Sequence, residues 1–120
     1  MRNYYQYRRS SRHYSKRMIA RTWRGTATGA NADAYARHFR DQVAPQLKML
    51  TGNRGSYLLR REVGERTEFV ALTFWESREA IRAFAGNDIE RAHVEPQARA
   101  VLAEFDEFAD HYEVAFSSSS

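Results

Sequence analysis

The sequence predicts an α+β domain with elements in the order β-α-β-β-α-β. The stretch Arg66–Gly86 carries much of this prediction, because its pattern changes once from strand to helix. Phe69–Trp75 is almost entirely apolar, as in a buried strand. Ser77 suits a helix N-cap, and a helical stripe of apolar residues follows it: Ala80, Ile81, Phe84 and Ala85. With 120 residues, of which 42% are hydrophobic, the chain has the size of one domain with a small core.

A β-hairpin is the second observation behind this fold class. Arg54–Val63 and Arg66–Trp75 flank Gly64-Glu65, and glycine at the first loop position suits a two-residue type II′ turn. The resulting register predicts three cross-strand pairs, which are Arg61 with Glu68, Leu59 with Val70, and Tyr57 with Leu72.

The first strand and the first helix precede the hairpin. We expect the strand at Met18–Arg24, ended by Gly25, and the helix to begin at an Asn31 N-cap with Asp33 in its first turn. The helical stripe consists of Ala32, Tyr35, Ala36, Phe39, Val43, Leu47 and Leu50. Pro45 lies inside this stripe and is expected to kink or split the helix near Ala44.

The C-terminal third is less regular. Beyond Gly86 we expect a single helical turn at Ile89–His93, a short helix at Pro96–Ala100, an ambiguous stretch at Val101–Phe108, a last strand at His111–Phe116, and a frayed end at Ser117–Ser120. The complete order is the ferredoxin-like arrangement around an antiparallel sheet.

Both faces of the predicted hairpin are largely apolar. One face carries Tyr57, Leu59, Val70, Leu72 and Phe74, and the other carries Leu58, Arg60, Phe69, Ala71, Thr73 and Trp75. An antiparallel sheet with helices on one side normally leaves the other face polar. A second copy of the chain is the simplest cover for the extra apolar face, so the pattern predicts a homodimer with sheet packed on sheet.

The charge is divided between a basic tail and a mildly acidic body. Met1–Arg17 holds six basic residues and no acid, so residues 18–120 have 13 basic and 15 acidic residues, although the net charge of the chain is +4. The tail is rich in Tyr, Arg and Ser and is expected to be disordered, either inert or as an arm that contacts phosphates. Nucleic acid is not an expected partner of the domain at 18–116. Met18 opens the first strand and is a second candidate start of translation.

Several site classes lack the required residues. There is no cysteine, no nucleotide-binding glycine motif and no nucleophile elbow. The four histidines have no ligand-type partners at metal-site spacing, so no metal is expected. No apolar run reaches the roughly 18 residues of a membrane span, and no segment resembles a secretory signal. We therefore expect a cytoplasmic protein without a membrane partner.

The strand that ends in Trp75-Glu76-Ser77, the helix SREAIRAFAG and the turn near Glu90–His93 resemble the antibiotic biosynthesis monooxygenase (ABM) family. The resemblance covers roughly Met18 to Phe116. It implies a dimeric α+β barrel built from ferredoxin-like protomers. It also implies one of several functions, since this superfamily includes proteins without known activity.

Two activities follow from the resemblance. One group oxidises polycyclic, quinone-forming aromatic substrates with O₂ and without metal or flavin. The other group binds and degrades haem through a histidine, a nearby tryptophan and an asparagine. His93 matches the histidine of that group, whereas Phe84 stands in the place of its tryptophan, and Thr22 or a neighbour in the place of its asparagine.

A cofactor-free oxygenase needs a dry aromatic cavity, a proton acceptor and a group that stabilises an oxyanion. Thr22 joins the aromatic residues as a candidate substrate contact, and the candidate walls are Trp23, Tyr57, Trp75 and Phe84. His38 or His93 could accept a proton, and Arg21, Arg24 or Arg60 could stabilise an oxyanion. Ordinary packing or a surface position is the competing interpretation for each of them.

Three hypotheses follow for the function. The first is a cofactor-independent monooxygenase acting on a small aromatic or quinol substrate. The second is a non-catalytic dimeric module that binds a small apolar ligand or a partner. The third is a haem-binding or haem-degrading monooxygenase that uses His93.

Overall fold

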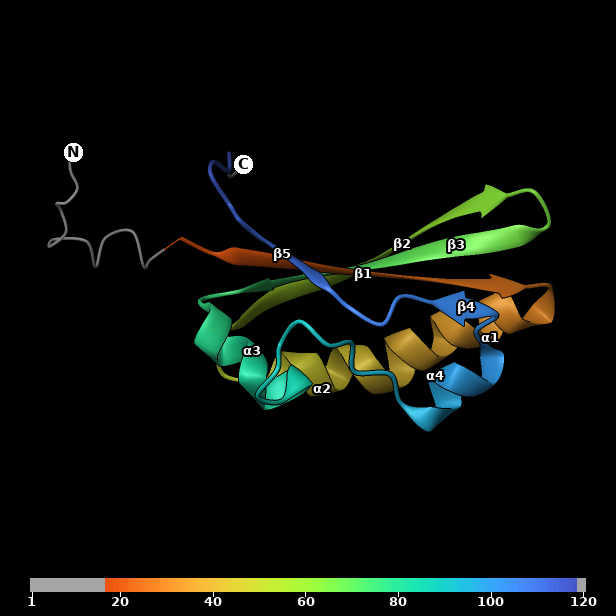
Figure 1. The fold of residues 1–120 in the computed structure, drawn as a ribbon, viewed down its shortest axis with the longest axis horizontal. Helices are drawn as coiled ribbons and strands as arrows, with labels where there is room; N and C mark the ends of the chain where they lie inside the picture. The colour runs from red at the N-terminus through yellow and green to blue at the C-terminus, as the bar shows by residue number, and fades with distance from the viewer. Residues whose placement is uncertain (1–16, 119–120) are drawn as a thin grey trace, which may run out of the picture.

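The computed structural model describes residues 17–118 and contains one antiparallel sheet with the helices on one face (Figure 1). Strand β1 (Ile19–Thr28) lies between β3 (Arg66–Trp75) and the two short strands β4 (Glu104–Phe105) and β5 (Asp110–Glu113). Strand β2 (Asn53–Val63) pairs with the other side of β3. The order β2-β3-β1-β4, with β5 also on β1, confirms the ferredoxin-like α+β prediction. The sheet remains open within this chain.

The helices follow the predicted stripes. The segments α1 (Ala30–His38), η2 (Phe39–Val43) and α2 (Ala44–Met49) follow one another without a break and run along the sheet. Helix α3 (Arg78–Ala85) follows β3, and α4 (Pro96–Val101) packs near α1. The Ser77 Oγ accepts a hydrogen bond from the Ala80 amide at 3.1 Å, which confirms the predicted N-cap.

Pro45 is accommodated by a π-helical segment. The segment η2 ends immediately before α2, where the proline occupies the first turn and its missing N–H removes no required hydrogen bond. The apolar stripe explains the wider turn, because Tyr35, Phe39, Val43 and Leu47 recur every four residues. On an ideal α-helix a four-residue step rotates by about 40° beyond a full turn. The π segment offsets this drift and keeps the stripe facing the sheet.

The hairpin register is as predicted. Arg61 pairs with Glu68, Leu59 with Val70 and Tyr57 with Leu72. Gly64 has a φ of 63°, whereas all described non-glycine residues, including the next loop residue, have negative φ. This combination fits the predicted type II′ turn.

The prediction that Gly25 ends the first strand is wrong. Strand β1 continues to Thr28, and Gly25 pairs with Phe69 on one side and Phe105 on the other. A Cβ at this position would lie 3.3 Å from the Trp23 ring and 3.4 Å from the Glu104 carbonyl oxygen. The glycine is therefore a point of close approach within the sheet.

Three other boundaries differ from the predictions. Helix α1 is capped by Gly29, whose carbonyl accepts the Ala32 amide at 3.1 Å, so Asn31 is not the N-cap. Ile89–His93 is only partly a turn. One turn closes between the Asp88 carbonyl and the Arg91 amide at 3.1 Å, and the backbone beyond it bonds to the 107–109 segment, with Ala92 N to Glu107 O at 2.8 Å. The last strand ends at Glu113, since its partner β1 begins opposite that residue at Ile19.

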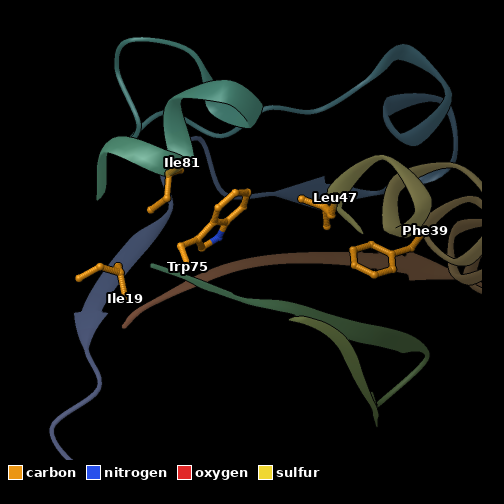
Figure 2. Packing of buried hydrophobic residues seen from close by; sticks show 5 residues of the cluster. All are labelled: Ile19, Phe39, Leu47, Trp75 and Ile81. Atoms are coloured by element: carbon orange, nitrogen blue, oxygen red, sulfur yellow. The ribbon is translucent and has the colours of Figure 1, made fainter. Parts of the chain in front are cut away.

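Two hydrophobic clusters fill the space between sheet and helices. One contains Ile19, Phe39, Leu47, Trp75 and Ile81, whose side chains lie between the sheet and the helical layer (Figure 2). The other contains Ala27, Ala32, Tyr35, Phe69 and Ala98. The side of β3 that carries Phe69 and Trp75 is therefore the helix-covered face.

The opposite face of the sheet is bare in the single chain. All four α-helices lie on the other side (Figure 1). Tyr57, Leu59 and Tyr112 have exposed fractions of 58%, 48% and 57%. The sheet thus presents an apolar surface to solvent, as the hairpin pattern predicts.

The predicted disordered tail, except Arg17, lies outside the described residues, as do Ser119 and Ser120. Arg17 lies 3.6 Å from the Glu113 carboxylate. Within residues 17–118, no helix has the length and apolar character needed to cross a membrane.

Candidate active site

A small cavity lies between the helix-covered face of the sheet and the helices. Its volume is about 50 Å³. Strands β1 and β3 form its floor, while α1, η2, α3, α4 and the segment before α4 form its walls. The lining residues are Arg21, Trp23, Tyr35, His38, Phe39, Val43, Ala71, Thr73, Phe84, His93, Val94, Glu95 and Ala98.

Aromatic rings make up much of the wall. Trp23 is fixed by its Nε1, which donates to the Asp106 carbonyl oxygen at 2.7 Å, and its ring lies 6.5 Å from that of Tyr35. Tyr35 packs on Phe69 with ring centroids 4.9 Å apart. Burial raises the pKa of Tyr35, so its phenol remains protonated at neutral pH and can donate a hydrogen bond but not act as a base.

His38 and Glu95 form a pair in this wall. The His38 Nε2 lies 3.4 Å from the Glu95 Oε1, and the two side chains are 9% and 25% exposed. This distance is short enough for an ion pair, but no atom is placed to form a hydrogen bond with the His38 Nε2. An adjacent carboxylate can orient an imidazole and stabilise its protonated form. His38 is thus placed as a proton acceptor that faces an aromatic cavity.

His93 is the second predicted base and lies at the exposed edge of the cavity. Its ring stands edge-on to Phe84, with centroids 5.3 Å apart. Phe84 in turn lies 6.2 Å from Trp75. His93 and Phe84 therefore form the solvent side of the cavity.

Arg21 is the buried cation of the cavity and is 5% exposed. Its Nη2 donates to the carbonyl oxygens of Ile89 and Arg91, at 3.1 and 3.2 Å. Desolvation lowers the pKa of Arg21 to about 10, which still leaves it cationic at neutral pH. Because Arg21 donates to the 89–91 backbone, it also holds the segment leading to His93 against β1.

Five predicted site residues do not line the cavity, and one of them, Arg24, is exposed and pairs with Glu68. Thr22 follows Arg21 on β1 and pairs with Leu72, so it lies on the bare face with Tyr57. Trp75 is fully buried, and its Nε1 donates to the Thr73 Oγ1 at 2.8 Å. Arg60 lies outside the cavity: its guanidinium is over the Phe69 ring at 5.3 Å and within 3.5 Å of the Asp33 carboxylate.

Sequence reasoning did not assign Tyr35, Thr73 or Glu95 to the site. Tyr35 belongs to the helical stripe and gave the same signal as a core residue. Thr73 was the single polar residue in an apolar strand, which is the one signal that could have marked it. Glu95 directly precedes Pro96 and meets His38 only through the tertiary fold.

The fold and this cavity can be compared with known proteins. The sequence profile of the antibiotic biosynthesis monooxygenases matches residues 18–96, well over half of the chain. The chain belongs to the antibiotic biosynthesis monooxygenase family. No curated protein sequence matches the chain closely enough to count as a relative.

Structures of similar fold have been solved for several proteins. A Nitrosomonas europaea protein assigned to the antibiotic biosynthesis monooxygenases has a TM-score of 0.64 at 13% identity, over 87% of this chain and 96% of that one. SnoaB, a cofactor-independent oxygenase from Streptomyces nogalater, has a TM-score of 0.56 at 17% identity, over 86% of this chain and 96% of that one. The haem degrader MhuD from Mycobacterium tuberculosis has a TM-score of 0.55 at 22% identity, over 84% of this chain and 99% of that one. At these identities the likeness shows a shared fold.

The cavity, as closed in this structure, is too small for a haem. Its volume of about 50 Å³ is far below the roughly 300 Å³ or more that ligand pockets commonly have. The His93 imidazole, the group that the family resemblance implies as an iron ligand, packs against the Phe84 ring with centroids 5.3 Å apart. For a directly bound metal ion, residues 17–118 contain no cluster of three or more His, Asp or Glu side chains.

Proposed function

We propose that this ABM protein is a cofactor-independent monooxygenase of a small aromatic or quinol substrate. The observation that carries the proposal is the His38–Glu95 pair, which places an imidazole 3.4 Å from a carboxylate in an aromatic-lined cavity. Membership of the ABM family supports this chemistry, and the fold is shared with the cofactor-independent oxygenase SnoaB.

The proposed reaction begins with removal of a substrate proton by the His38 imidazole. Glu95 stabilises the imidazolium that forms. The resulting electron-rich phenolate or carbanion reduces O₂ directly; one oxygen atom enters the substrate as a carbonyl, and the other leaves as water. Tyr35 supplies a hydrogen-bond donor for the oxyanion, and Arg21 adds a positive charge to the cavity.

A second candidate function is a non-catalytic module that binds a small apolar ligand, because the lining of the cavity is largely apolar. A space of about 50 Å³ is smaller than the roughly 150 Å³ of an apolar cavity that admits benzene. Substrate entry therefore requires an outward movement at the exposed side, where His93 and Phe84 lie. A binding module would be stabilised by its ligand without turnover.

Oxygen consumption with a panel of small quinols and hydroxyarenes tests the enzyme. We expect uptake by the full chain, a loss of about 10²–10⁴-fold in kcat for His38→Ala, and a smaller loss for Glu95→Gln. Arg40→Ala is the control, since Arg40 is exposed and pairs with its neighbour Asp41. Equal uptake by His38→Ala and the unmodified protein would contradict the role of His38. Ligand-induced stabilisation without uptake would favour the binding module.

We also propose that two copies associate through the bare face of the sheet. Tyr57 and Phe74 stack edge-on across the hairpin at 6.2 Å and are joined there by Leu59 and Leu72, an arrangement that a second sheet could cover. Arg61 and Arg24 flank this surface and both pair with Glu68.

Light scattering tests the association. We expect a mass near twice the 14.0 kDa of one chain at micromolar concentration. Leu72→Glu should give single chains, because it places a charge in the centre of the apolar surface. Glu79→Lys on the exposed side of α3 is the matched control and should leave the mass unchanged. A single-chain mass for the unmodified protein would overturn this proposal.

A further inference from the structure

The charge of Arg21 is not compensated by any acidic group that the structure describes. Among residues 17–118, no carboxylate lies within ion-pair distance of its guanidinium, although only 5% of the residue is exposed. Its Nη2 is used by two backbone carbonyls, whereas its Nε is buried without a hydrogen-bond partner. The guanidinium also lies over the Phe84 ring, with its Cζ 5.7 Å from the ring centroid. The Nε, however, carries the cost of a buried donor without a hydrogen bond.

The other acidic group of the cavity does not supply that partner. Glu95 lines the same cavity, but its carboxylate is engaged by His38 at 3.4 Å. His111 stands beside Arg21 on β5 and offers no negative charge, and its Nε2 is also buried without a partner. Glu90 and Asp110 act on His111 electrostatically, yet neither reaches Arg21 within 4 Å in the described structure.

Thr73 provides a neighbouring donor on the same side of the sheet. Arg21 and Thr73 are directly paired across β1 and β3, so their side chains point to the same face and are close together. The Thr73 Oγ1 accepts from the Trp75 Nε1 at 2.8 Å, which orients the hydroxyl and leaves its proton free to be donated. Both residues line the cavity.

We infer that Arg21 and Thr73 form an anion-binding subsite, and that the ligand of the cavity is an aromatic compound carrying a carboxylate. The Arg21 Nε and the Thr73 hydroxyl are two donors for its oxygens, and the ring contacts Trp23 and Phe84. The inference rests on the proposed function in one respect, since it takes this cavity as the ligand site. The inference specifies that the ligand carries a group that is charged before the reaction begins. A phenol, by contrast, ionises only during the reaction.

The competing explanation is that Arg21 serves only as a structural tie to the 89–91 backbone. The two explanations make different predictions for charged and neutral ligands of equal shape. A structural tie gives no preference between such ligands, whereas an anion subsite favours the charged one. Benzoate and benzamide are a matched pair for this comparison, because they differ in charge and hardly in size.

Binding of benzoate and benzamide to the full chain can be followed by calorimetry and by the fluorescence of Trp23, one of the two tryptophans. We expect benzoate to bind at least 10-fold more tightly than benzamide at neutral pH. Benzoate is larger than the closed cavity, so its ring is expected at the exposed side beside Phe84. Arg21→Met should remove the preference, and Arg21→Lys should retain part of it. Arg24→Met, on the bare face, should keep the full preference.

Equal affinity of the unmodified protein for the two compounds, or binding of neither, would overturn the inference. A preference that persists in Arg21→Met would do so as well. If Arg21→Met does not fold, the ratio in the unmodified protein and its reduction in Arg21→Lys decide the question. Oxygen uptake is measured separately. A preference for benzoate without quinol oxidation, and quinol oxidation without that preference, are then distinct results. The failure of one proposal is thereby distinguished from the failure of the other.

Discussion

The two faces of the sheet are built from the same strands and have different neighbours. On β3, Phe69 and Trp75 are fully buried beneath the helices, while Leu72 and Phe74 alternate with them and remain partly exposed on the other side. Both sets are apolar, so residue type alone does not separate the covered face from the bare one. The difference comes from which side the connecting helices occupy.

The two faces also hold their polar groups differently. On the covered face, Arg21 and His38 are buried in a cavity with few partners. On the bare face, Arg24 and Arg61 share the Glu68 carboxylate, and these pairs hold the pKa of Glu68 below its usual range. Satisfied surface pairs suit an interface or solvent, whereas incompletely paired buried groups are typical of a ligand site.

The largest difference between the faces is expected for the truncation of one aromatic residue on each. Trp75→Ala removes a fully buried ring and should lower the free energy of unfolding by about 3–5 kcal/mol. Tyr57→Ala should change the stability of the single chain by about 0.5 kcal/mol or less. Urea unfolding at several protein concentrations measures both. A large concentration-independent effect of Tyr57→Ala would contradict the assignment of the bare face.

A smaller effect is expected where the α2–β2 loop contacts α3. Gly52 has a φ of 92°, and an added Cβ would lie 2.6 Å from the Ala80 Cβ. Gly52→Ala should therefore destabilise by about 1–3 kcal/mol through strain and overpacking. Gly29→Ala is a matched control, because its φ is 56° and an added Cβ has open space. Equal losses for the two variants, measured by thermal unfolding, would show that the contact with Ala80 has no additional cost.

The smallest effect is expected at the edge of the covered face, where His111 lies. Desolvation, followed by the charge of Arg21, lowers the pKa of His111. The unfolded chain should bind a proton near pH 6.5, while the folded chain binds it only at lower pH. Stability should consequently fall as the pH drops from about 6.5 through the folded-state pKa, and His111→Gln should flatten this dependence. An unchanged pH profile of urea midpoints in His111→Gln would assign the dependence to other groups.

The fold could be predicted because local patterns and tertiary contacts agree. The hairpin register followed from one loop glycine and the alternation around it, and the two helices followed from their apolar stripes. The predictions failed where pairing with a distant part of the chain outweighed the local sequence pattern. Gly25 remained in β1 because two strands approach it. The turn predicted at Ile89–His93 stops at Arg91 because the backbone beyond it bonds to residues 107–109.

The site was only partly predictable for a related reason. Arg21, Trp23, His38, Phe84 and His93 were candidates by residue type, and the structure brings them to one cavity. Glu95 could not be chosen, because its partner His38 is 57 positions earlier in the chain and no periodic pattern connects them. Tyr57 and Trp75 were candidates because aromatic residues suit a cavity wall, but their strand positions place one on the bare face and the other in the core.

The outer strand β2 has a consequence for aggregation. It forms one edge of the sheet, where unpaired backbone groups could recruit strands from other chains. Its sequence places Arg54, Arg60, Arg61 and Glu62 along this edge, and the register shifts between Asn53 and Gly55. Charges and an irregular register oppose the addition of a further strand. Growth into fibrils by edge-to-edge pairing is thereby disfavoured, and this edge is compatible with the proposed face-to-face association.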